Sequence, residues 1–198
     1  MGGADTRRAR LVHGGVTVER LVPVPGLAGP MTSSRAGDVA TRMARDFEPG
    51  VRAWRVGSDE GCDEHGRSFR WELRFDLPER RTELVVTIGF PPFEESGARG
   101  GAVASVRLLP FPAEGSELAR MERAGQITRR RIRGVWRQHM RDRLPLPEDF
   151  PDSTVLSRVV GSEVIRSVHA LTSRMRGPVW VVETPGRTRH FRLDDFVR

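Results

Sequence analysis

Arginines recur at a fixed interval in the middle of the chain. Arg129, Arg133, Arg137 and Arg141 follow one another every four residues, and Arg130 adjoins the first of them. In an α-helix this interval aligns the side chains along one flank, about 100° around the axis from the apolar stripe. Guanidinium groups pair well with phosphates and carboxylates. The spacing therefore predicts a binding surface for an acidic partner, and we call these five residues the arginine ridge.

Codon bias limits what the choice of arginine means. The chain contains no Lys, Asn or Tyr, so all 33 basic residues are arginine, a composition typical of a GC-rich genome. Codon bias does not explain the excess of basic over acidic residues, which gives a net charge of +7. Residues 113–143 hold nine arginines against four acidic residues and so supply five of these seven charges. The local excess of charge, rather than the identity of the residue, carries the prediction.

The predicted partner is an acidic macromolecule, a protein in the first place and a nucleic-acid backbone in the second. The sequence has no zinc-finger, RRM or KH motif, and Trp136 falls on the apolar stripe, where it cannot stack on exposed bases. We therefore expect the ridge to act through charge, without reading a base sequence. The alternative is that the arginines form only a solvated helix face.

A second group of chemically active residues lies in the loop 57–66. Cys62 and His65 have the spacing of metal ligands, and four carboxylates surround them. A structural zinc site needs a second pair of ligands, but the chain has no other cysteine, and the loop lacks the EF-hand pattern. Cys62 and His65 are therefore kept only as an alternative to a solvated hairpin loop. We predict no cofactor and no catalytic residue.

Alternating side chains give the clearest signal of secondary structure. Residues 68–77 place apolar side chains at every second position, which predicts a strand with one buried face. Residues 84–90 continue the alternation after a turn, and 51–56 and 103–109 have the right length to flank this hairpin. Sequential strands usually pair, so the four strands predict an antiparallel meander.

Apolar spacing predicts helices on one face of this meander. The expected ranges are 38–47 and 116–144, with Gly125 ending or bending the second. Residues 154–175 predict a C-terminal helix whose first half is ambiguous between helix and strand. Pro185-Gly186 predicts a type II turn in a hairpin of strands 179–183 and 188–193. The predicted fold class is α+β: a four-stranded antiparallel meander packed against helices, with a C-terminal helix and β-hairpin.

The chain is predicted to form a single α+β domain over residues 37–198, preceded by a loosely ordered arm, 1–36, that carries one edge strand. No apolar run approaches the roughly 20 residues that span a bilayer, and no signal-peptide core follows the N-terminus. The single cysteine suits a reducing compartment. We therefore expect a cytoplasmic protein without membrane insertion, whose oligomeric state the sequence leaves open.

The sequence favours a non-catalytic interaction module that uses the arginine ridge. The alternative is an enzyme or small-ligand-binding domain with a pocket between the sheet and the helices. Trp71 and Phe75 on the sheet side, with Trp136 opposite, are the aromatic residues that could line such a cavity.

Overall fold

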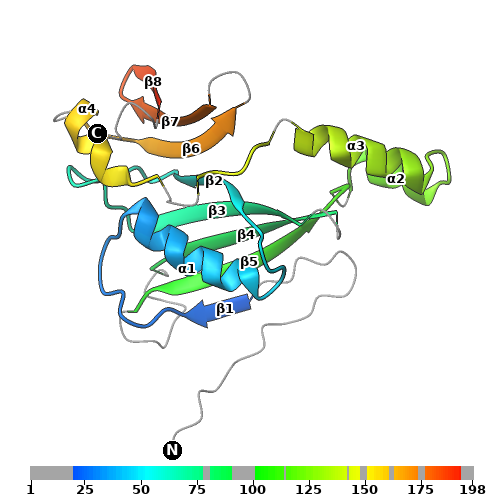
Figure 1. Cartoon of the computed structure of the whole chain (residues 1–198), viewed down its shortest axis with the longest axis horizontal. Helices are drawn as coiled ribbons and strands as arrows, with labels where there is room; N and C mark the ends of the chain where they lie inside the picture. Colours follow the sequence, from blue (N-terminus) through cyan, green and yellow to red (C-terminus); the bar gives the residue numbers. More distant parts are fainter. Residues whose placement is uncertain are drawn as a thin grey trace, which may run out of the picture.

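One antiparallel sheet of eight strands forms the frame of the molecule (Figure 1). The computed structural model describes residues 20–77, 81–90, 101–113, 115–141, 143–147, 151–160, 163–173 and 177–192. Across the sheet the strands run in the order β1-β5-β4-β3-β2-β6-β7-β8. Their bounds are β1 (Arg20–Pro23), β2 (Ala53–Ser58), β3 (Arg70–Leu77), β4 (Thr82–Gly89), β5 (Val103–Pro110), β6 (Ser167–Ser173), β7 (Gly177–Thr184) and β8 (Arg187–Arg192).

The four central strands are those that the sequence predicts. β2, β3, β4 and β5 lie next to one another, and β3 and β4 pair along their whole length. The predicted four-stranded meander is nevertheless too small, because β1 pairs with β5 on one side and β6 pairs with β2 on the other. β1 ends in Pro23, which suits an edge strand because proline cannot donate a ladder hydrogen bond. The fold is therefore α+β with a sheet twice as wide as expected.

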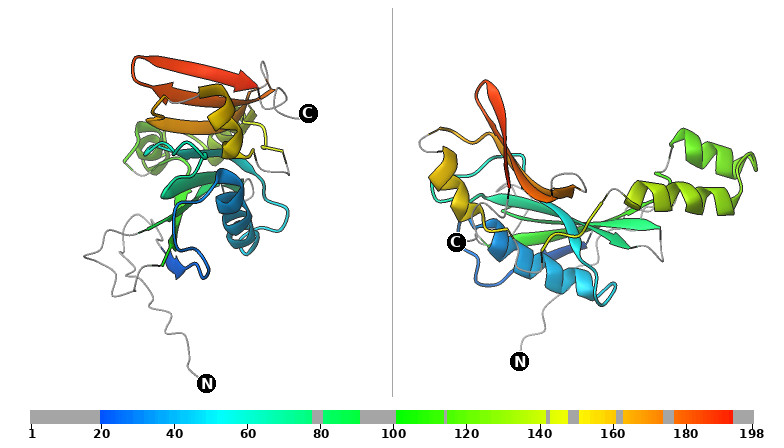
Figure 2. Two further views of the ribbon diagram at one scale, coloured as in Figure 1. Left: turned by 90° about the vertical axis from the view of Figure 1, so that its left-hand side faces the viewer. Right: turned by 45° about the horizontal axis from the view of Figure 1, so that its top comes forward.

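Helix α1 (Ser33–Arg45) covers one face of the sheet (Figure 1, Figure 2). The alternation of β3 turns a row of apolar side chains into the core on the same side as α1. Small side chains on α1 let the helix approach the strands closely. The fully buried residues of β3 are Trp71, Leu73, Phe75 and Leu77, and the buried apolar residues of α1 are Ala36, Val39, Ala40 and Ala44.

The start of α1 differs from the sequence prediction. Thr32 is the N-cap, its hydroxyl accepting from the Arg35 N–H, so the helix begins at Ser33 instead of residue 38. Met31 is also buried, and its carbonyl accepts a 2.7 Å hydrogen bond from Trp71 Nε1. Residues from the predicted N-terminal arm thus contribute to the core.

The predicted C-terminal helix 154–175 is wrong. The chain instead forms a short 3₁₀ helix, η1 (Ser153–Val155), a single helical segment, α4 (Leu156–Val160), and then β6. Val164, on the predicted helical stripe, is 70% exposed. β-Branched residues favour extended backbone, and pairing with both β2 and β7 decides the outcome in favour of a strand. The hairpin after it is confirmed: β7 pairs with β8 around Pro185-Gly186, and Gly186 has φ +89°.

The segment 116–144 forms two helices, α2 (Glu117–Arg123) and α3 (Arg129–Arg141), which Gly125 separates with φ +69°. The prediction that this segment covers the sheet is wrong. Figure 1 shows both helices beyond the ends of β4 and β5, away from the face that α1 covers. The helix pair has a small cluster of its own: Ile132 and Trp136 are buried but lie outside the core cluster of the sheet. The Trp136 ring centroid lies 5.0 Å from that of Phe111.

Candidate functional site

Helix α3 buries one side and exposes its arginines on the others. Thr128 precedes the helix, and its hydroxyl accepts a 3.3 Å hydrogen bond from the Arg131 N–H. Ile132 and Trp136, one turn apart, turn toward the protein. All five residues of the arginine ridge are exposed: Arg129, Arg130, Arg133, Arg137 and Arg141. Arg131, which the sequence analysis did not include in the ridge, is exposed as well. Its side chain points about 100° around the helix axis from that of Arg130.

The charges of the ridge are not neutralised within the part of the chain that the structure describes. None of its five guanidinium groups lies within ion-pair distance of a carboxylate there. Arginines of the sheet behave differently: Arg74 lies 2.7 Å from a Glu72 oxygen, and Arg107 lies 3.5 Å from the other oxygen of the same carboxylate. The surplus of positive charge is therefore concentrated on the helix that projects from the sheet.

The distribution of charge along α3 opposes the stability of the helix itself. Its first turn contains no acidic residue but three arginines, which repel the positive end of the helix dipole. The ridge also places like charges four residues apart, and each such pair costs about 0.2–0.5 kcal/mol. A bound polyanion would remove both costs. The first turn of α2 has the opposite sign, because it contains Glu117.

Little apolar surface accompanies the ridge. Val135, 38% exposed, is the one large apolar side chain that α3 exposes among those the structure describes. Beside it Gly134 has no atom within 4 Å of the position a Cβ would occupy. A partner on this face would therefore contact charged side chains and the accessible backbone at Gly134, and would find no apolar centre.

Arg143 fixes the end of the helix pair to the sheet. Its Nη1 lies 2.7 Å from Asp76 Oδ1 and 3.4 Å from Glu83 Oε1, and the group is mostly buried. The guanidinium also stacks over Trp54, 4.0 Å from the ring centroid. The charge of Arg143 is thus used inside the protein, unlike those of the ridge.

Among the described residues, Cys62 and His65 are not joined by further side chains that could bind a metal ion. Burial, followed by the charge of Asp63, raises the pKa of the Cys62 thiol to about 12, so the thiol stays protonated at neutral pH. His65 is exposed and lies 3.6 Å from Glu64. In the described ranges, no group of three or more His, Cys, Asp or Glu side chains lies close enough to hold a metal ion.

Asp63 instead closes the loop that contains Cys62. Its carboxylate accepts hydrogen bonds from the backbone N–H groups of His65 and Arg67, at 2.9 and 2.8 Å, and from Arg67 Nε at 3.0 Å. Burial would raise the pKa of Asp63, but these bonds and the Arg67 charge outweigh it and hold the pKa below the usual value. The carboxylate therefore organises the loop.

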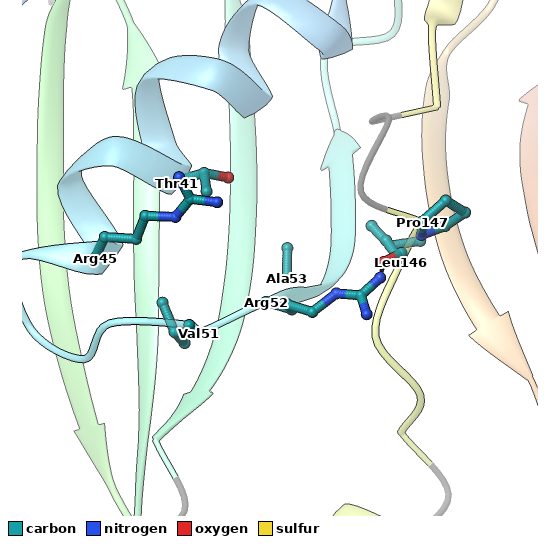
Figure 3. Close-up of a pocket in the computed structure, with 8 residues that line it drawn as sticks. Thr41, Arg45, Val51, Arg52, Ala53, Leu146 and Pro147 are labelled. Carbon is teal, nitrogen blue, oxygen red and sulfur yellow. Dashed lines mark hydrogen bonds between the residues drawn. The ribbon is translucent and has the colours of Figure 1, made fainter.

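The aromatic residues expected to line a pocket do not share one. Trp71 and Phe75 are fully buried in the packed core of the sheet, whereas Trp136 belongs to the helix pair. A pocket of about 160 Å³ lies elsewhere, between α1, the segment that enters β2, and residues 146–147 (Figure 3). Its lining residues are Thr41, Arg45, Gly50, Val51, Arg52, Ala53, Leu146 and Pro147. These residues are distant in sequence, so no local pattern indicates the pocket.

The Thr41 hydroxyl at this pocket is buried and has no hydrogen-bond partner in the described chain. We expect Thr41→Val to raise the free energy of unfolding by about 1 kcal/mol, because valine keeps the shape and removes the unsatisfied hydroxyl. Urea denaturation measures the change. The control is Thr32→Val, which removes the N-cap bond to the Arg35 N–H and should lower the same quantity by about 1 kcal/mol. A loss of stability in Thr41→Val would show that the hydroxyl is already satisfied.

No protein family model, curated protein or solved structure matches the chain. Among the described residues, no helix has both the length and the apolar character needed to cross a membrane. The case for a function therefore rests on the geometry of the side chains, and above all on α3.

Proposed function

We propose that the protein is a non-catalytic interaction module that binds an acidic macromolecule through the arginine ridge of α3. The observation that carries the proposal is the row of exposed guanidinium groups, without ion pairs in the described chain, on a helix that projects from the sheet. The charge pattern supports it further: Arg129 and Arg130 face the positive end of the helix dipole, and the ridge places like charges four residues apart, so a bound polyanion would relieve both repulsions.

The exposed flank of α3 favours a nucleic-acid backbone over an acidic protein as the partner. The sequence alone favours these two partners in the opposite order. Protein interfaces usually contain an apolar centre with aromatic residues, whereas Val135 is the one large apolar side chain that α3 exposes among those the structure describes. A phosphate backbone needs no such centre. Ridge arginines four residues apart are separated by about 6 Å along the helix axis, so the ridge can contact several phosphates in succession.

The test is the affinity for random-sequence duplex DNA, measured by fluorescence anisotropy at several salt concentrations. With about four phosphates neutralised, the affinity should fall about 100-fold between 50 and 200 mM salt. The double variant Arg133→Glu/Arg137→Glu should bind about 100-fold more weakly than the original protein at low salt, because it removes two phosphate contacts and adds two repulsive charges.

The matched control reverses two exposed arginines away from α3, in Arg35→Glu/Arg192→Glu, and gives the same change in net charge. It should reduce the affinity only a few-fold. Equal losses in the two double variants would mean that net charge, and not α3, governs binding. Absence of DNA binding at 50 mM salt, together with tight binding of a polyglutamate peptide, would replace the nucleic acid with an acidic protein.

A further inference from the structure

Two arginines from different elements line the pocket beside α1, one on each side. Arg45 belongs to the last turn of α1, and Arg52 to the segment between α1 and β2. Figure 3 shows Thr41 and Arg45 on one side of the pocket, and Arg52 with Leu146 and Pro147 on the other. The site is separate from the arginine ridge, and none of its lining residues belongs to α3.

The fold holds Arg52 in place and leaves most of its donors available. Arg52 Nη2 donates a 2.8 Å hydrogen bond to the Leu146 carbonyl, and the Leu146 N–H donates a 2.7 Å bond to the Ala53 carbonyl. A guanidinium has five N–H donors, so one bond orients the group without saturating it. Within the described ranges, no carboxylate forms an ion pair with Arg45 or Arg52. Among the described residues, the pocket therefore presents two positive charges that no carboxylate pairs with.

The remaining lining combines one hydroxyl with apolar walls. The Thr41 hydroxyl is buried and lacks a partner among the described residues, so it is available to a ligand after a small adjustment. Val51, Ala53, Leu146 and Pro147 supply apolar contacts. The volume of about 160 Å³ corresponds to roughly five water molecules at about 30 Å³ each, which limits a ligand to a few heavy atoms.

We propose that this pocket binds a small organic carboxylate with a short apolar body. The carboxylate lies between Arg45 and Arg52, whose planar groups match its two oxygens. The apolar body contacts Val51, Ala53 and Leu146. A purely inorganic oxyanion would satisfy the guanidinium groups and leave the apolar walls without a partner.

Titration of ¹⁵N-labelled protein with butyrate, and separately with inorganic phosphate, tests the proposal. Butyrate should shift the amide signals of Thr41, Val51 and Ala53 in a saturable way, with a Kd of about 1 mM. Arg45→Gln and Arg52→Gln should each raise this Kd about tenfold or more. The control is Arg42→Gln, because Arg42 is an exposed arginine in the same last turn of α1 and does not line the pocket.

Three outcomes would overturn the proposal. The first is a titration without saturation up to about 100 mM butyrate, far above the expected Kd. The second is an equal loss of affinity in Arg42→Gln and Arg45→Gln, and the third is tighter binding of phosphate than of butyrate. Arg52→Gln loses a hydrogen bond to Leu146, so circular dichroism must check that this variant folds. Arg45 is exposed, and the result for Arg45→Gln decides the test if Arg52→Gln does not fold.

Discussion

Gly66→Ala is expected to lower the free energy of unfolding by about 4 kcal/mol. Gly66 has φ +71°, a conformation that costs an L-residue about 1–2 kcal/mol. A Cβ at this position would lie 2.1 Å from the Ser153 carbonyl oxygen and 2.7 Å from the Thr154 nitrogen. Both are backbone atoms, so η1 itself must move.

That movement would break a buried hydrogen-bond network. Ser153 Oγ donates to the Gly66 carbonyl at 2.5 Å and accepts from the Ser33 N–H at 2.9 Å. Ser33 Oγ in turn accepts from the Ser153 N–H at 2.9 Å and donates to the Pro151 carbonyl at 2.5 Å. Both serines are completely buried, and each unsatisfied buried group costs about 1–3 kcal/mol.

Urea denaturation followed by tryptophan fluorescence measures the loss. Gly125→Ala is the matched control, because Gly125 has φ +69° but no atom within 4 Å of its would-be Cβ. It should cost only the conformational strain of about 1–2 kcal/mol. Equal losses in the two variants would mean that Gly66 does not lie against η1 in solution.

Arg143→Gln should lower the free energy of unfolding by about 2 kcal/mol. The variant removes the cation that contacts Asp76 and Glu83 and stacks on Trp54, in a mostly buried place where charges are poorly screened. Denaturation in urea again gives the value. Arg67→Gln breaks a more exposed ion pair with Asp63, and that pair should contribute less than about 1 kcal/mol. If Arg143→Gln costs no more than Arg67→Gln, the anchor of the helix pair lies elsewhere.

The central strands were predictable because their pattern is local. Along β3 every second side chain is buried, so the period of two is visible in the sequence itself. Strand β6 was not predictable from the sequence, because its apolar residues also fit a helical spacing. Its pairing with β2 and β7 decides its conformation. The position of α3 was missed for a related reason. An apolar stripe with Ile132 and Trp136 shows that a helix has a buried side, and does not show what that side packs against.

The candidate sites likewise differ in whether their residues are close in sequence. Exposure of the arginine ridge follows from the phase of one helix, so residue spacing was enough to anticipate it. The pocket combines α1, the entry to β2 and residues 146–147, and the ion pairs of Arg143 span 60 and 67 positions. Such groupings depend on strand order, which the sequence prediction had only for the central four strands and for the β7-β8 hairpin.

The helix pair leaves the sheet and rejoins it at one place. β5 ends at Pro110, which pairs with Thr82, and on the return Arg143 contacts the neighbouring Glu83. A connection whose two ends are already held together adds little closure entropy when it changes in length. The helix pair and the sheet are therefore structurally independent: a longer or shorter pair would leave the register of the eight described strands unaltered.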